Sequence, residues 1–133
     1  MVASDVHLAF GAELYQLQMD GGRYFLHESP EGSKSWSRTP MVMITRDGRV
    51  HKIVGDQCQY GQESFKSDPA KKPIGWMSKS KEVLKKLGKR CSGRGDCSRP
   101  KQGRHATASG RVAGEAAVYP FKFCRAILEG CRN

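Results

Sequence analysis

Three cysteines and one histidine between residues 58 and 105 constrain this chain more than any other feature. Cys58, Cys91, Cys97 and His105 lie in a stretch that is rich in glycine and in basic residues. Zinc in proteins is held by four thiolate or imidazole donors, and a structural zinc ion supplies folding free energy that a small core lacks. The sequence therefore predicts a metal site formed by these four residues, with zinc as the candidate ion.

The spacing of these residues does not by itself define a zinc signature. Cys91 and Cys97 are separated by five residues, and His105 lies eight positions beyond Cys97. Neither gap is the tight knuckle of the common zinc motifs. Glycines within the loop allow it to fold back, and the neighbouring arginines favour the thiolate form that binds metals. The alternative is a set of free thiols in a mobile loop, and the residues alone leave both interpretations open.

The length and composition predict one intracellular domain. The chain has 133 residues, 38% of them hydrophobic, which suits a single domain over residues 1–133 with a modest core. No run of about 18 apolar residues is present, so we expect no transmembrane helix. The N-terminus lacks the features of a secretory signal, and five cysteines without secretory context argue against a disulfide framework. We therefore expect a nuclear or cytoplasmic protein that is not secreted.

The positive charge is concentrated in one segment. The formal net charge is +10, and residues 66–104 contain thirteen Lys and Arg against three Asp and Glu, which leaves +10 for this segment and a neutral remainder. The segment overlaps the Cys/His loop. Such a concentration fits contacts with phosphates, which dominate nucleic-acid affinity. DNA or RNA is the expected partner, and a solvated basic face or an anionic membrane surface is the alternative.

Aromatic residues alternate with lysines between residues 60 and 79. Trp76, Tyr60 and Phe65 lie near four of the lysines, and aromatic rings beside cations suit unpaired bases. They suit core packing equally well. The predicted nucleic-acid-binding residues are Lys71, Lys72, Trp76, Lys79, Arg94 and Arg104.

Hydrophobic periodicity and capping residues predict a mixed α/β architecture. Helices are expected over residues 5–19, 81–90 and 121–130, and strands over 23–27, 50–54 and 74–77. Residues 39–48 fit either a short helix or a hairpin, and the helix is preferred. Residues 91–114 lack periodicity and are expected to form a basic, glycine-rich loop. The predicted fold is a partial Rossmann-like sheet of three or four strands with flanking helices and a basic Cys/His loop.

The sequence also predicts the roles of two individual side chains. Glu28 follows the first predicted strand. In open α/β sheets, ligands bind at the carboxyl ends of the strands, so Glu28 is a candidate catalytic residue. Cys124 lies between Phe123 and Ile127 on the last predicted helix, so we expect it to be a core cysteine.

Taken in order, several short motifs resemble one family. They lie at residues 26–30, 57–61, 72–79, in the Cys/His cluster and at 119–127. Together they are similar to the C-terminal half of phage-type DNA cytosine methyltransferase-like proteins, segments of which occur in retrotransposon polyproteins. The resemblance implies that Glu28 is the catalytic glutamate and that Cys58, Cys91 and His105 bind the metal, with Cys97 as an extra candidate. Ser29 and Ser78-Lys79 depart from the family pattern.

In that family, the N-terminal half of the fold binds S-adenosylmethionine. No counterpart of that half is present before Glu28. The cofactor is therefore not expected to bind this chain alone. The resemblance implies a nucleic-acid-interacting module that is not catalytic by itself. The alternatives are a split DNA methyltransferase completed by a second polypeptide that supplies the cofactor-binding half, and a retroelement remnant without present activity.

Overall fold

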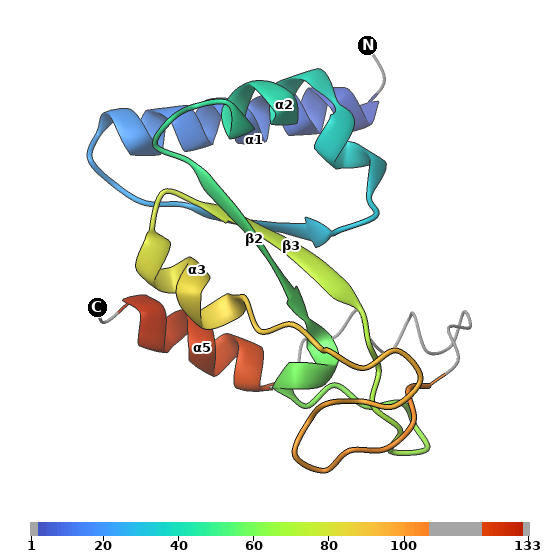
Figure 1. The fold of residues 1–133 in the computed structure, drawn as a ribbon. Helices are drawn as coiled ribbons and strands as arrows, with labels where there is room; N and C mark the ends of the chain where they lie inside the picture. Colours follow the sequence, from blue (N-terminus) through green and yellow to red (C-terminus); the bar gives the residue numbers. More distant parts are fainter. Residues whose placement is uncertain (1–2, 107–120, 132–133) are drawn as a thin grey trace.

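A three-stranded sheet lies at the centre of the computed structural model, which describes residues 3–106 and 121–131 (Figure 1). The strands are β1 (Leu26–Pro30), β2 (His51–Asp56) and β3 (Pro73–Ser78), in the spatial order β1-β3-β2. Both outer strands pair antiparallel with β3. The predicted mixed α/β fold with flanking helices is confirmed. A Rossmann-like sheet is not confirmed, because β3 returns between β1 and β2 in the opposite direction.

One face of the sheet is covered by α1 (Ala3–Asp20) and α2 (Thr39–Thr45), joined to β1 and η1 (Lys34–Ser37) by short segments (Figure 1). Met77 of β3 contributes to the core on this side. The buried residues of this core are Met19, Phe25, Met41, Ile44, Val50 and Met77.

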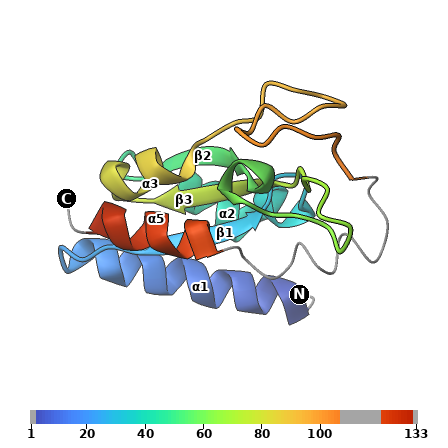
Figure 2. The same ribbon diagram turned by 90° about the horizontal axis from the view of Figure 1, so that it is seen from below.

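The other face is covered by α3 (Lys81–Leu87) and α5 (Phe121–Cys131), which lie side by side (Figures 1 and 2). Ser80 caps α3, because its side chain accepts a hydrogen bond from the Val83 amide at 3.3 Å. A Cβ at Gly130 would lie 2.6 Å from the Val83 Cα, so glycine permits the close approach of the two helices. The buried residues of this core are Tyr60, Ile74, Trp76, Val83, Leu84, Leu87, Phe123 and Ala126.

Trp76 lies in this second core and not on the surface. As the central strand, β3 is covered on both faces, with Ile74 and Trp76 toward α3 and α5 and Met77 toward α1 and α2. The Trp76 side chain is 2% exposed and packs against Phe123. The prediction that Trp76 contacts nucleic acid is therefore wrong, because its ring has no face open to a base.

The predicted elements are largely present, with shifts at their ends. The preferred helix at residues 39–48 is confirmed as α2, whereas the helix predicted over 81–90 ends at Leu87. β1 begins at Leu26, so Glu28 lies inside a strand and not beyond its end. Cys124 is exposed and not a core residue, because α5 turns Phe123, Ala126 and Gly130 inward. The part of the predicted 91–114 loop beyond residue 106 lies outside the described residues.

Across residues 3–106 and 121–131, the helices are too short or too polar to cross a lipid bilayer.

Candidate metal centre

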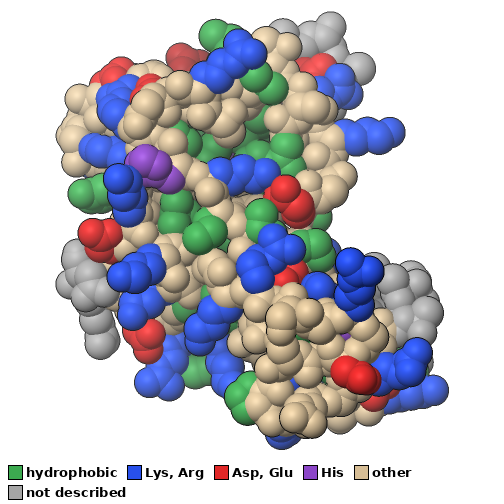
Figure 3. Space-filling view, viewed as in Figure 1, with side chains coloured by type: hydrophobic (Ala, Val, Ile, Leu, Met, Phe, Trp, Pro, Cys, Tyr) green, Lys and Arg blue, Asp and Glu red, His purple; other side chains and the backbone are tan. Residues whose placement is uncertain are grey.

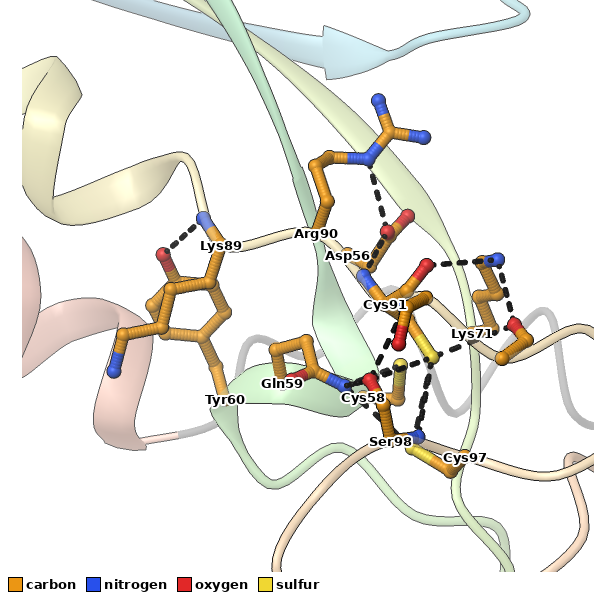
Figure 4. A network of polar contacts seen from close by, with 12 residues as sticks. Asp56, Cys58, Gln59, Tyr60, Lys71, Lys89, Arg90, Cys91, Cys97 and Ser98 are labelled. Atoms are coloured by element: carbon orange, nitrogen blue, oxygen red, sulfur yellow. Dashed lines mark hydrogen bonds and ion pairs between the residues drawn. The ribbon is translucent and has the colours of Figure 1, made fainter.

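The Cys/His cluster forms where two distant segments of the chain meet. Cys58 lies in η2 (Gln57–Tyr60), which directly follows β2, whereas Cys91, Cys97 and His105 come from the loop after α3. The four possible ligand atoms lie within 4.8 Å of one another, and the three cysteines are buried. Figure 4 shows the three cysteine side chains converging between η2 and the loop. These four residues therefore lie close together, as predicted, and can hold a metal ion such as zinc.

Two separations between ligand atoms match those expected around one tetrahedral ion. The Sγ atoms of Cys91 and Cys97 are 3.9 Å apart, and Cys91 Sγ is 3.5 Å from His105 Nε2. Zinc bonds of about 2.3 Å to sulfur and about 2.0 Å to nitrogen, at tetrahedral angles, place two sulfurs about 3.8 Å apart and a sulfur and nitrogen about 3.5 Å apart. Three thiolates and one imidazole also complete a closed coordination shell, which is typical of structural zinc sites.

The histidine is oriented for metal binding by a hydrogen bond on its far side. His105 Nδ1 lies 2.6 Å from the carbonyl oxygen of Arg94. Because a carbonyl oxygen only accepts hydrogen bonds, Nδ1 must carry the proton and donate it. The lone pair is then on Nε2, the ring nitrogen that lies beside Cys91 Sγ. Histidines that bind metals are commonly fixed in this way through the second ring nitrogen.

Hydrogen-bond donors surround the sulfur atoms. The Ser98 amide and hydroxyl each lie 3.5 Å from Cys91 Sγ, and the Arg99 amide lies 3.5 Å from Cys97 Sγ. The side-chain amide of Gln59 lies 3.7 Å from Cys58 Sγ and 3.6 Å from Cys97 Sγ. Such donors stabilise thiolates more than thiols. These donors therefore favour the ionised form that binds a metal.

The thiols differ in their readiness to ionise. Although burial acts to raise it, hydrogen bonds from Ser98 lower the pKa of Cys91 to about 6. Burial, in contrast, raises the pKa of Cys58 to about 12. In the protein without metal, the Cys91 thiol therefore ionises more readily than the Cys58 thiol.

A buried carboxylate joins the end of β2 to the start of the loop. Asp56 is completely buried, and its Oδ2 accepts hydrogen bonds from the Cys91 amide at 2.7 Å and from Arg90 Nε at 2.9 Å (Figure 4). The first contact fixes the backbone of one ligand residue, and the second supplies the opposite charge. Asp56 therefore sets the position of Cys91 relative to Cys58, two residues beyond it in η2.

The loop itself is closed by backbone contacts. The Cys97 amide donates to the Gly103 carbonyl, and the His105 amide donates to the Gly95 carbonyl, both at 2.7 Å. A Cβ at Gly93 would lie 1.7 Å from the Asp96 carbonyl oxygen, so only glycine allows this turn. The loop is thus a folded structure that returns His105 to Cys91.

The predicted nucleic-acid-binding lysines have different surroundings. Lys71 Nζ donates to the carbonyl oxygens of Gly93 at 3.1 Å and Cys91 at 3.5 Å (Figure 4). It therefore supports the loop of residues 91–105, which carries three of the four candidate ligands and is called the metal loop below. Lys72 is half-buried. Lys79 Nζ lies 5.1 Å from the centre of the Tyr24 ring. Lys71 therefore has a structural role that the sequence pattern did not indicate.

The remaining predicted site residues lie apart from one another. Arg94 and Arg104 are exposed on the metal loop. Glu28 is exposed in β1, on the opposite edge of the sheet from β2, which leads to Cys58. The structure therefore does not bring Glu28 to the Cys/His cluster.

Several residues around the cluster were missed by reasoning from the sequence. Gln59 and Ser98 each follow a cysteine, and that adjacency was the only signal for their roles. Asp56 gave no signal, because the segment that it contacts is remote in the chain.

Fold and site together define a mixed α/β domain with a closed Cys3His cluster at the base of a basic loop. Comparison with protein-family models, with curated proteins and with solved structures found no match to this chain. Its function is therefore inferred from its own residues.

Proposed function

We propose that this chain is a nucleic-acid-binding module whose basic loop is ordered by a zinc ion on Cys58, Cys91, Cys97 and His105. The observation that carries the proposal is the position of this four-donor cluster at the base of a loop that displays cations. Arg94, Lys101 and Arg104 are exposed on that loop. Zinc has no redox chemistry, and a closed shell of four protein ligands leaves no position for a substrate. The ion's role in this function is structural.

The zinc ion would join two parts of the chain that are otherwise held together by a few hydrogen bonds, such as the one from the Asp56 amide to the Lys89 carbonyl at 2.9 Å. Cys58 is fixed by the sheet through η2, and the other three ligands belong to the loop. Three buried cysteines packed together cannot all be ionised without a cation, because their charges repel at this distance. A bound ion removes that repulsion and anchors the loop to the sheet. Because the exposed cations lie on this loop, the distances between them would depend on whether the ion is bound.

Exposed cations continue from the loop along α3. Lys81 and Lys85 are one turn apart on α3, so they share a face, and Lys89 follows just before the loop. Figure 3 shows Lys and Arg side chains over the part of the molecule that contains α3 and the loop, and others over the part that contains α1 and α2. The exposed basic residues of the segment are Lys66, Lys71, Lys81, Lys85, Lys86, Lys89, Arg90, Arg94, Lys101 and Arg104. A polyanion is the partner that such a surface suits, since each phosphate contact releases condensed counterions.

Binding to short oligonucleotides at a series of salt concentrations tests the proposed function. We expect measurable binding at low salt and a linear fall of log K with log salt concentration, with a slope of about −0.7 per phosphate contacted on a single strand. Removing zinc with a chelator should lower the affinity, and adding zinc back should restore it. Absence of binding at low salt would contradict nucleic-acid binding. Equal affinity with and without metal, in protein shown to lose a bound ion, would contradict the role given to zinc.

A further inference from the structure

A cavity lies at the opposite end of β3 from the metal loop. It has a volume of about 610 Å³, within the range of small-ligand sites, and lies between the segment before β1, the start of α3 and the end of α5. Its apolar lining includes Leu26, Val83 and Ile127. Its polar lining includes Tyr24, Lys79 and Lys81.

The walls of this cavity are fixed by hydrogen bonds through one buried serine. Ser78 is 1% exposed, its hydroxyl donates to the Phe25 carbonyl at 2.5 Å, and the same oxygen accepts from the Ser80 amide at 3.0 Å. This joins the segment before β1 to the segment before α3. On the Tyr24 side, the Gln18 side-chain amide donates to the Tyr24 carbonyl at 3.1 Å. The cavity is therefore formed before any ligand binds.

The chemistry of the lining selects a flat aromatic ligand that carries negative charge. The Tyr24 ring is 62% exposed, so it offers a face for stacking. Lys79 Nζ lies 5.1 Å from the centre of that ring, and Lys81 is exposed at the rim. Glu82, the acid among the residues that line the cavity, leaves it with one excess positive charge. A nucleotide matches this set, because its base has apolar faces and its phosphate is anionic.

We propose that this cavity binds one base of a single-stranded nucleic acid, stacked on Tyr24, with Lys79 and Lys81 at the neighbouring phosphates. The inference rests on the proposed nucleic-acid-binding function and adds a specific subsite to it. Lys81 also begins the row of cations that continues through Lys85 to Lys89 and the metal loop. A strand with one base in the cavity therefore has its backbone directed along α3. Duplexes bind less well, because a paired and stacked base does not reach the ring.

Substitutions at Tyr24 test the subsite through oligonucleotide affinity at one fixed salt concentration. Tyr24→Ala should weaken binding of a single-stranded oligonucleotide by roughly 5- to 150-fold, the range measured for stacking of one base on an aromatic ring. Tyr24→Phe should retain the affinity, because it keeps the stacking face. Phe10→Ala is the matched control, since Phe10 on α1 is also 62% exposed but does not line the cavity.

The outcomes separate this inference from the function on which it rests. If the oligonucleotide binds the Tyr24→Ala and wild-type proteins equally, the subsite is wrong while nucleic-acid binding stands. If the wild-type protein does not bind the oligonucleotide even at low salt, both proposals are wrong. Equal binding of a matched abasic strand by the wild-type protein would also overturn the subsite, since a stacked base is then unnecessary.

The thiol of Cys131 provides a second readout that needs no substitution at Tyr24. Cys131 is exposed and lines the cavity, whereas Cys124 is exposed on the same helix but does not line it. In Cys124→Ser protein, a single-stranded oligonucleotide should slow the reaction of Cys131 with a maleimide. In Cys131→Ser protein, the reaction of Cys124 should be unchanged. Equal protection of both thiols, or of neither, would contradict occupation of this cavity.

Discussion

Replacing Cys91 with serine is expected to reduce the zinc content of the purified protein from about one equivalent per chain to nearly none. Cys91 lies at the centre of the cluster, with the Cys97 sulfur at 3.9 Å, the His105 ring at 3.5 Å and two donors from Ser98 on its own sulfur. A serine hydroxyl does not ionise at neutral pH and is a poor ligand for zinc. Metal analysis of protein purified without chelator provides the measurement.

The same variant should lose the order of the loop. Trypsin cleaves after Lys and Arg, and Arg94, Lys101 and Arg104 are exposed on the folded loop. We expect faster cleavage at these sites in Cys91→Ser, because local unfolding exposes backbone to proteases. Cys124→Ser is the matched control, since it removes an exposed thiol of α5 outside the cluster. Wild-type zinc content in Cys91→Ser would exclude the metal site described here.

Replacing Lys85 and Lys89 together with glutamine is expected to flatten the salt dependence of oligonucleotide binding. If each lysine contacts one phosphate, the slope of log K against log salt concentration becomes shallower by about 1.4 for a single strand. Both side chains are exposed between the Tyr24 cavity and the metal loop, and neither residue is a metal ligand. The fold and the zinc content should be unchanged.

The control for this pair removes the same charge elsewhere. Lys34 and Arg46 are exposed outside residues 66–104, on the α1 and α2 side of the sheet. Lys34→Gln with Arg46→Gln should leave the slope unchanged if phosphates follow α3. An equal change of slope in both double variants would indicate a general effect of net charge and would contradict a defined path.

The composition of the metal site could be predicted from the sequence, whereas its construction could not. Cysteine and histidine in a glycine-rich loop indicate metal binding, and the structure brings all four residues together. Cys97 lies in the cluster together with the other three residues, although the family resemblance made it only an extra candidate. The support from Asp56 and Lys71 was not predictable, because their contacts with the loop span about 20 to 35 residues of sequence.

The prediction of the nucleic-acid interface failed at the aromatic residues for a related reason. Trp76 and Tyr60 alternate with lysines, but both are buried against Phe123. Helices cover both faces of this sheet, so its central strand buries side chains on both sides, and the sequence did not show that β3 is that strand. Tyr24 is the exposed ring beside Lys79, although the two residues are 55 positions apart.

The expected catalytic geometry depended on parallel strands. In a parallel sheet, Glu28 would lie at the end of a strand near other catalytic groups. The antiparallel pairing places Glu28 inside an edge strand, opposite Trp76 of β3. Order along the chain does not determine strand direction, so the sequence did not distinguish these arrangements.

Titration of the metal-free protein with cobalt(II) tests whether Cys58, Cys91, Cys97 and His105 form one metal site. Cobalt occupies zinc sites, and its visible absorption distinguishes tetrahedral from octahedral coordination and reports bonds to thiolates. We expect tetrahedral absorption with the charge-transfer intensity of three thiolates, saturation at about one equivalent, and complete displacement by zinc. Octahedral absorption, or thiolate bonding that persists unchanged in Cys91→Ser, would contradict a single Cys3His centre formed by Cys58, Cys91, Cys97 and His105.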